Sequence, residues 1–177
     1  KKIKMLRSHG MEKNKRIMRK GLWQYEMRNL GYNYRLTDFQ CALGISQLDN
    51  LDKSLKKKNY IYKFYYNYFK NYDHIIPPVT KNNVSNGFHL YPLLVDFKKN
   101  SEKILFFKKM MSKNIKLQVH YIPIYRQPFY KKRYDFNYSD FPNSEKFYKK
   151  VISIPFYFDL NLKDLRYISK TIVDLSK

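Results

Sequence analysis

The chain has 177 residues, of which 44% are hydrophobic and 18% aromatic, so its composition is that of a folded domain rather than a disordered tail. No run of about 18 apolar residues occurs, so we expect no transmembrane helix. The 36 basic and 14 acidic residues give a formal net charge of +22. Because the lysines are spread over the whole chain, general composition explains this charge better than nucleic-acid binding does.

The single cysteine, Cys41, cannot form an internal disulfide and suits a reducing compartment, so we expect a cytoplasmic protein. Cys41 lies beside Ala42 in an apolar helical pattern, which favours a place in the core over a nucleophile. The first residues contain no initiator Met and no apolar signal core. We therefore expect the chain to begin within a longer protein or after processing.

The first 37 residues predict little regular structure. Residues 1–19 read as the end of a helix and a loop, in which Gly10 stops the helical pattern. The short aromatic stretch 21–27 predicts an extended segment, and a turn follows at Gly31.

A long helix is predicted directly behind this turn. Thr37 is a suitable N-cap, and Gln40 stands three residues later, which makes a capping box. Apolar residues then recur at helical spacing, and no proline interrupts before Pro77. The helix is therefore expected from about Asp38 to about Tyr72, with room for a kink.

The remaining residues alternate between short strands and helices. Strands are expected at 88–97, 115–121 and 151–155, and helices at 101–112, from residue 142, and from Asn161 to about Leu175. Ser101 and Asn161 are the expected N-caps. Pro92 argues that the first strand lies at an edge or contains a bulge. The pattern predicts an α+β fold, with a mostly antiparallel sheet covered by helices on one side.

Asn33 and Arg35 are the first candidate site residues. An amide at a helix-entry turn can donate a hydrogen bond to a phosphate, and a guanidinium can hold a carboxylate or diphosphate with two parallel bonds. The alternative is a structural turn, with Asn33 in a left-handed conformation and Arg35 paired with Asp38. The spacing alone leaves both open.

His120 and Tyr121 are the second candidates, at the end of the strand expected at 115–121 and before the proline-rich loop 122–128. Loops after strands often display ligand-binding groups, although a lone histidine is more often a packing residue. No zinc spacing and no phosphate-binding glycine pattern occurs, so no metal site is expected.

Several strings, in chain order, resemble the DegT/StrS family of sugar-nucleotide aminotransferases. They are Arg-Ser-His-Gly at 7–10, Tyr-Glu-Met at 25–27, residues 30–38 with Gly-Tyr-Asn-Tyr-Arg, Ala-Leu-Gly at 42–44, Gln-Leu at 47–48, Phe-His-Leu-Tyr-Pro at 88–92, residues 119–128 with Val-His-Tyr-Ile-Pro, Phe-Pro-Asn-Ser-Glu at 141–145 and Ser-Ile-Pro at 153–155. Within this family the chain most resembles the pseudaminic-acid pathway enzymes, which aminate a UDP-linked 4-keto sugar.

The resemblance implies part of a fold-type I enzyme that depends on pyridoxal 5'-phosphate (PLP). Residues 1–37 would end the large PLP-binding domain, residues 38–72 would form the long linking helix, and residues 73–177 would form the small C-terminal α+β domain. Family members are homodimers with shared active sites. Glutamate would donate the amino group to C4 of a UDP-linked 4-keto-6-deoxy-N-acetylhexosamine, and neither nucleic acid nor membrane would be a partner.

The resemblance also assigns roles to single residues. Asn33 would reach the PLP phosphate of the neighbouring subunit, while Arg35, His120 and Tyr121 would line the sugar-nucleotide pocket, with Tyr125 as a further candidate. The Schiff-base lysine of the family lies upstream of the Arg-Ser-His-Gly string, so no catalytic residue is expected in this chain, which should be inactive alone. The alternatives are a non-catalytic partner domain and a basic nucleic-acid-binding domain.

Overall fold

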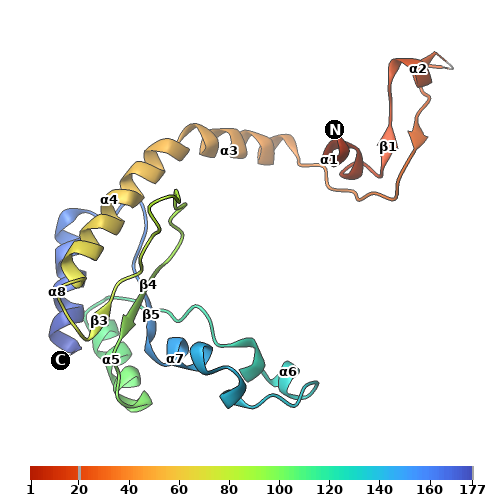
Figure 1. Cartoon of the computed structure of the whole chain (residues 1–177). Coiled ribbons are helices and arrows are strands. Elements are labelled where there is room, and N and C mark those ends of the chain that lie inside the picture. The colour runs from red at the N-terminus through yellow and green to blue at the C-terminus, as the bar shows by residue number, and fades with distance from the viewer. Residues whose placement is uncertain (20, 177) are drawn as a thin grey trace. The chain divides into compact units, whose positions relative to one another are not determined.

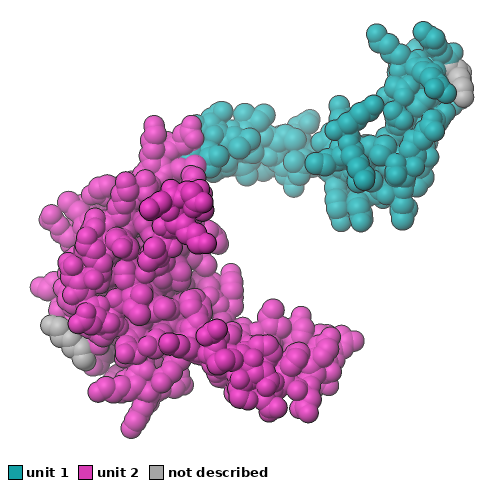
Figure 2. Space-filling view, in the orientation of Figure 1, with its two compact units in different colours: residues 1–51 teal, residues 52–177 magenta. Residues whose placement is uncertain are grey.

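The structure is a computed structural model that describes residues 1–19 and 21–176. It divides into two compact units, unit 1 from Lys1 to Leu51 and unit 2 from Asp52 to Lys177, which Figure 2 colours separately. The three-part division at residues 37 and 72 stays a prediction.

Unit 1 consists of short elements and one longer helix (Figure 1). They are α1 (Lys2–Leu6), β1 (Met11–Glu12), α2 (Lys15–Met18), β2 (Glu26–Met27) and α3 (Asp38–Asp49). The strands β1 and β2 pair in antiparallel register. Asn14 caps α2 because its side chain accepts a hydrogen bond from the Ile17 backbone at 3.0 Å. The expected helix end is present, but the segment expected to be extended over residues 21–27 is so only at Glu26–Met27, because the Gln24 amide donates to the Gly21 carbonyl and closes a turn before it.

The long helix is interrupted once. The predicted capping box is confirmed, since the Thr37 side chain accepts from the Gln40 backbone and the Gln40 side chain accepts from the Thr37 backbone. Helix α3 ends at Asp49 with Asn50 as its C-cap, the Asn50 side-chain amide donates to the Ser46 carbonyl at 2.9 Å, and α4 (Leu51–Phe69) follows. A side chain that bonds the preceding turn competes with the helical ladder, which explains the interruption.

Helix α3 has no buried residue. The prediction that Cys41 lies in the core is therefore wrong, because its thiol is exposed. Phe39 and Leu48 are also exposed, although the sequence pattern counted them as one apolar stripe. The pattern shows that a helix has apolar residues, but it does not show what covers them.

Unit 2 is built on a three-stranded antiparallel sheet of order β3-β4-β5 (Figure 1). After α4, its elements are β3 (Ile75–Ile76), β4 (Tyr91–Val95), α5 (Asn100–Ser112), η1 (Ile124–Arg126), α6 (Pro128–Lys131), η2 (Tyr138–Asp140), α7 (Pro142–Lys150), β5 (Val151–Ile154) and α8 (Leu162–Leu175). The final helix begins at the predicted cap, because Asn161 and Asp164 form a reciprocal capping box.

One face of this sheet packs on three helices. Tyr91, Leu93 and Val95 alternate along β4 and are all buried, and register places Leu93 opposite Ile152 of β5. The same core contains apolar residues of the three helices, namely Ile61, Tyr65 and Phe69 of α4, Phe106 and Met110 of α5, and Leu165, Ile168 and Ile172 of α8. The predicted α+β class, with an antiparallel sheet covered by helices, is therefore confirmed.

Three expectations for this unit are corrected. Pro92 lies in the central strand rather than at an edge, but β3 pairs only with Leu94 and Val95, so Pro92 has a strand neighbour on one side alone. No strand forms over residues 115–121, where only Gln118 pairs with Ser153 as an isolated bridge. Ser101 is not the cap of α5, which begins one residue earlier.

Within residues 1–19 and 21–176, no helix is long and apolar enough to cross a bilayer.

Candidate functional site

A close backbone crossing holds the Gly31–Arg35 segment in place. The Tyr32 amide donates to the Leu6 carbonyl at 2.7 Å, and the Tyr34 amide donates to the Arg7 carbonyl at 2.8 Å. A Cβ atom on Gly31 would lie only 2.1 Å from the Gly10 nitrogen, so only glycine fits there. The glycine of this string therefore serves close contact with the Arg-Ser-His-Gly string.

This crossing presents Asn33 and Arg35 to the outside. Both side chains are exposed, and Asn33 pairs through its backbone with Ser8. The rings of Tyr32 and Tyr34 stack with centroids 4.9 Å apart, as alternate residues of an extended segment can. The structural alternative for these residues is not supported. Asn33 is not among the described residues with positive φ, and no Arg35–Asp38 ion pair forms in the described part.

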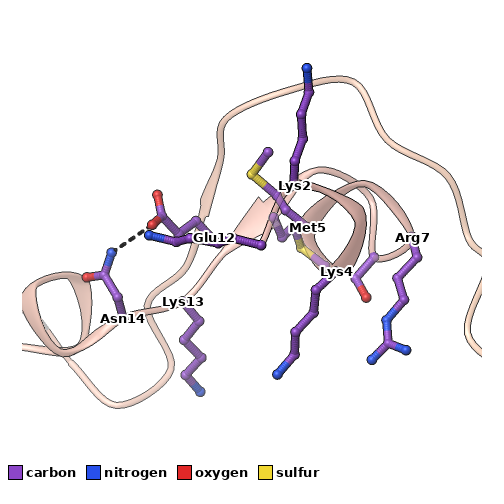
Figure 3. A pocket seen from close by; sticks show the side chains of 10 residues that line it. Lys2, Lys4, Met5, Arg7, Glu12, Lys13 and Asn14 are labelled. Atoms are coloured by element: carbon purple, nitrogen blue, oxygen red, sulfur yellow. Dashed lines mark hydrogen bonds between the residues drawn. The ribbon is translucent and has the colours of Figure 1, made fainter.

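Unit 1 contains a basic cavity of about 660 Å³, and Ser8, the backbone partner of Asn33, is part of its wall. Figure 3 shows the side chains that line it. Four of the labelled ones are cationic, namely Lys2, Lys4, Arg7 and Lys13, and Glu12 is the one carboxylate among the lining residues. Glu12 accepts a hydrogen bond from Asn14 at 3.2 Å. This charge balance favours an anionic ligand.

His120 and Tyr121 form the centre of the candidate site in unit 2. His120 is half-buried, and its Nδ1 lies 2.9 Å from the Ser153 hydroxyl on β5. The bridge between Gln118 and Ser153 brings the two segments together. Tyr121, joined to His120 by a cis peptide bond, is 73% exposed, and the two rings meet edge to face at 4.8 Å. A histidine fixed through Nδ1 can present Nε2 to a ligand.

Tyr125 lies in a different environment from Tyr121. It is 7% exposed, its ring stacks on Phe141 at 4.2 Å, and its hydroxyl donates to Glu145 at 2.8 Å. Burial raises the pKa of the Tyr125 phenol, and the Arg126 guanidinium, paired with Glu145, holds the pKa of that carboxyl below its usual range. The structure thus gives Tyr125 a role in supporting its loop, and its substrate-binding role stays a prediction.

The predicted residues fall into two groups, one in each unit. Asn33 and Arg35 belong to unit 1, whereas His120, Tyr121 and Tyr125 belong to unit 2. Sequence reasoning missed Ser153 and Glu145 as partners of the second group. Both residues occur in strings that carry the family resemblance, but these strings predict only a strand at Ser153 and a helix at Glu145. The described residues contain no cluster of three or more metal-binding side chains.

Comparisons with known proteins give one consistent result. The model of the DegT/DnrJ/EryC1/StrS aminotransferase family matches residues 1–173. The chain is 38% identical over 174 residues to the UDP-4-amino-4,6-dideoxy-N-acetyl-beta-L-altrosamine transaminase of Campylobacter jejuni, which covers 98% of this chain and 44% of that protein.

Solved structures agree with this match. Helicobacter pylori PseC, an aminotransferase involved in the biosynthesis of pseudoaminic acid, aligns with a TM-score of 0.80 at 31% identity, over 98% of this chain and 45% of that one. A Streptococcus pneumoniae protein assigned as a sugar aminotransferase, in its PMP form, aligns with a TM-score of 0.84 at 27% identity, over 98% of this chain and 43% of that one.

The chain therefore spans less than half the length of the relatives that it matches. Its α+β structure corresponds to part of a fold-type I PLP-dependent enzyme, as the sequence predicted. The order of the strings, the matched residues and the fold lead to the same conclusion. This chain belongs to the DegT/DnrJ/EryC1/StrS aminotransferase family.

Proposed function

We propose that this chain is the C-terminal part of a PLP-dependent aminotransferase that moves an amino group from glutamate to C4 of a UDP-linked 4-keto-6-deoxy-N-acetylhexosamine. The observation that carries the proposal is the 38% identity to the Campylobacter jejuni UDP-sugar transaminase over 98% of this chain. In this proposal the lysine that holds PLP is supplied by the part of the protein that precedes Arg7, so the 177 residues alone are inactive.

Unit 1 offers suitable groups for the phosphate of PLP. The Asn33 amide is exposed and can donate an N–H to a phosphate oxygen, and half of the residues that line the cavity at its backbone partner Ser8 are cationic. PLP, when bound, supplies the electron sink for the transfer of the amino group. A relative of this chain has been solved in PMP and PLP forms, which supports the same cofactor here.

The sugar nucleotide would be bound by the other exposed candidates. The planar Arg35 guanidinium suits a diphosphate, which it can hold with two parallel hydrogen bonds. His120 is oriented by Ser153 and can donate to or accept from a sugar hydroxyl or carbonyl oxygen, while the exposed Tyr121 ring can cover an apolar sugar face. The net charge of +22 would draw the anionic substrate toward the protein.

A homodimer is part of the same proposal. In the described residues of unit 1, Ile17 is the one buried hydrophobic residue, whereas Trp23, Leu36 and Phe39 are each more than half exposed. Exposed apolar groups in this number mark surfaces that are covered by other protein. We assign this cover to the rest of the subunit and to a second copy. Sedimentation of the full-length protein at a single-subunit mass would contradict the dimer.

The proposed activity is tested on the full-length protein, with glutamate and a UDP-linked 4-keto sugar as substrates and 2-oxoglutarate formation as the readout. His120→Asn should lower kcat/KM at least tenfold, because a directional hydrogen bond to the substrate is lost. His74→Asn is the matched control, since His74 also contacts a serine hydroxyl, that of Ser176, at 3.1 Å. Equal losses in both variants would assign His120 a structural role only.

Arg35 is tested in the same assay. Arg35→Gln should raise KM for the UDP-sugar about 10- to 100-fold, the usual range for a lost charge-assisted bond, without a similar change for glutamate. Arg16→Gln changes another exposed arginine of unit 1 and controls for net charge. A full-length protein that bound no PLP and formed no 2-oxoglutarate would sink the proposed function as a whole.

A further inference from the structure

Unit 2 contains a buried lysine that the proposed function does not use. Lys103 of α5 is only 8% exposed, and its Nζ donates one hydrogen bond, at 2.8 Å, to the Tyr148 carbonyl of α7. The Nζ atom also lies 5.4 Å from the centre of the Tyr148 ring. No carboxylate pairs with Lys103 in the described residues. A lysine is rarely buried without such a partner, because its charged form loses hydration.

The side chain of Lys103 lies at a cavity that is large enough for a small molecule. The side chain lines a cavity of about 450 Å³, with apolar walls that include Ile104, Phe107 and Val119. A cavity of this volume can admit a small molecule. Two exposed lysines, Lys108 and Lys149, line the same cavity and would attract a small anion to its mouth.

We propose that Lys103 is a site of covalent modification, at which its amine takes the acyl group of small acyl phosphates. The amine nitrogen forms a bond to the acyl carbon, and the bond between that carbon and the phosphate oxygen breaks. Inorganic phosphate leaves with the electron pair, and the proton of the amine passes to water. The product is an amide, whose N–H can still donate to the Tyr148 carbonyl.

The protonation of Lys103 supports this chemistry. Burial lowers the pKa of its ammonium group to about 8. At pH 7.5 the fraction of neutral amine is then roughly 200 times that of an ordinary exposed lysine. Nucleophilicity falls with basicity, as it does for thiols, so a smaller advantage in rate is expected.

The test uses the 177-residue chain, acetyl phosphate at pH 7.5, and mass spectrometry that assigns each acetyl group to a residue. Lys103 should be acetylated at least tenfold faster than Lys108 or Lys149, which share its cavity. Its rate should level off above about pH 8, while the rates of the two exposed lysines keep rising. A Lys103 rate equal to or below theirs would overturn the proposal.

A pair of variants tests the cavity itself. Ile104→Trp fills the cavity from a position that is 51% exposed, and it should slow the acetylation of Lys103 at least fivefold. Leu105→Trp is the matched control, because Leu105 is equally exposed on the same helix but does not line this cavity. Equal rates at Lys103 in both variants would refute the cavity as the route. The readout needs neither PLP nor a sugar, so its failure leaves the proposed aminotransferase untouched.

Discussion

Tyr91 and Tyr65 differ in one hydroxyl contact, and this difference predicts opposite effects of the same substitution. Both rings are fully buried in the core of unit 2, with centroids 5.1 Å apart. The Tyr65 hydroxyl donates to the Pro155 carbonyl at 3.0 Å, whereas the Tyr91 hydroxyl is buried without a partner in the described residues. A Tyr→Phe change removes a satisfied group at one site and an unsatisfied group at the other.

The expected free energies follow from these contacts. Tyr65→Phe should lower the free energy of unfolding by about 1 kcal/mol, since a buried hydrogen bond is lost. Tyr91→Phe should raise it by about 1 kcal/mol, because a desolvated hydroxyl without a partner is removed and the ring volume is kept. For a chain of this length, about 2 kcal/mol separates the melting temperatures by roughly 4–8 °C.

Thermal and urea unfolding of the two variants and the wild-type chain would measure this difference. Burial raises the pKa of both phenols, most strongly through the lost hydration of the phenolate. A raised pKa of an acid contributes stability that is present below the ordinary pKa of about 10 and is lost as the pH rises above it. Each variant should therefore weaken the alkaline loss of stability. Equal destabilisation by Tyr91→Phe and Tyr65→Phe would refute the assignment of an unsatisfied hydroxyl to Tyr91.

Three further predictions concern the backbone crossing and two charged groups. Gly31→Ala should speed amide exchange at residues 6–10 and 31–34, because its Cβ would clash with the Gly10 backbone. Gly44→Ala is the control, since a Cβ there meets nothing within 4 Å, and it should stabilise α3 by about 0.5–1 kcal/mol. Similar exchange rates at residues 6–10 and 31–34 in both variants would contradict this prediction. The stability of the wild-type chain should rise between pH 8 and pH 10, because the unfolded state binds more protons at Lys103, and urea titrations of Lys103→Met should show a smaller rise. The lowered pKa of the Glu145 carboxyl contributes stability that is present above about pH 4.5 and is lost as the pH falls through the folded-state pKa. Glu145→Gln should therefore lower the melting temperature by a few degrees at pH 7 and by less at pH 3. The same loss at both pH values would count against the contact with Arg126.

Sequence reasoning succeeded where the determining contacts are local. The capping boxes at Thr37 and Asn161 each join residues three apart, so a short pattern contains all the necessary information. It failed where the partner is distant. The pairing of Gln118 with Ser153 replaces the expected strand, and no local pattern shows that only one bridge forms. The exposure of Cys41 likewise depends on which protein surface covers α3, which periodicity cannot specify.

The candidate site shows the same division. The Gly31–Arg35 string and the His120–Tyr121 pair are recognisable as motifs in the sequence. The contacts that determine their residue types, however, join residues that lie far apart in the sequence. Gly31 is glycine because the backbone at Gly10 lies against it, and His120 is held by a serine 33 residues away.

The two units also differ in what holds them together, and this bears on the proposed activity. Apart from Ile17, every buried hydrophobic residue among those described lies in unit 2, so unit 2 has a core of its own. Unit 1 is ordered mainly by backbone hydrogen bonds around Gly10 and Gly31, which contribute about 1 kcal/mol each at most when they are exposed to water. Asn33 and Arg35 are held in this way, so their side chains keep a fixed position only when further protein excludes water from the crossing. The phosphate-binding role proposed for Asn33 therefore requires the cover of the complete subunit, whereas the His120–Ser153 contact, which rests on the sheet of unit 2, should already be formed in the 177-residue chain.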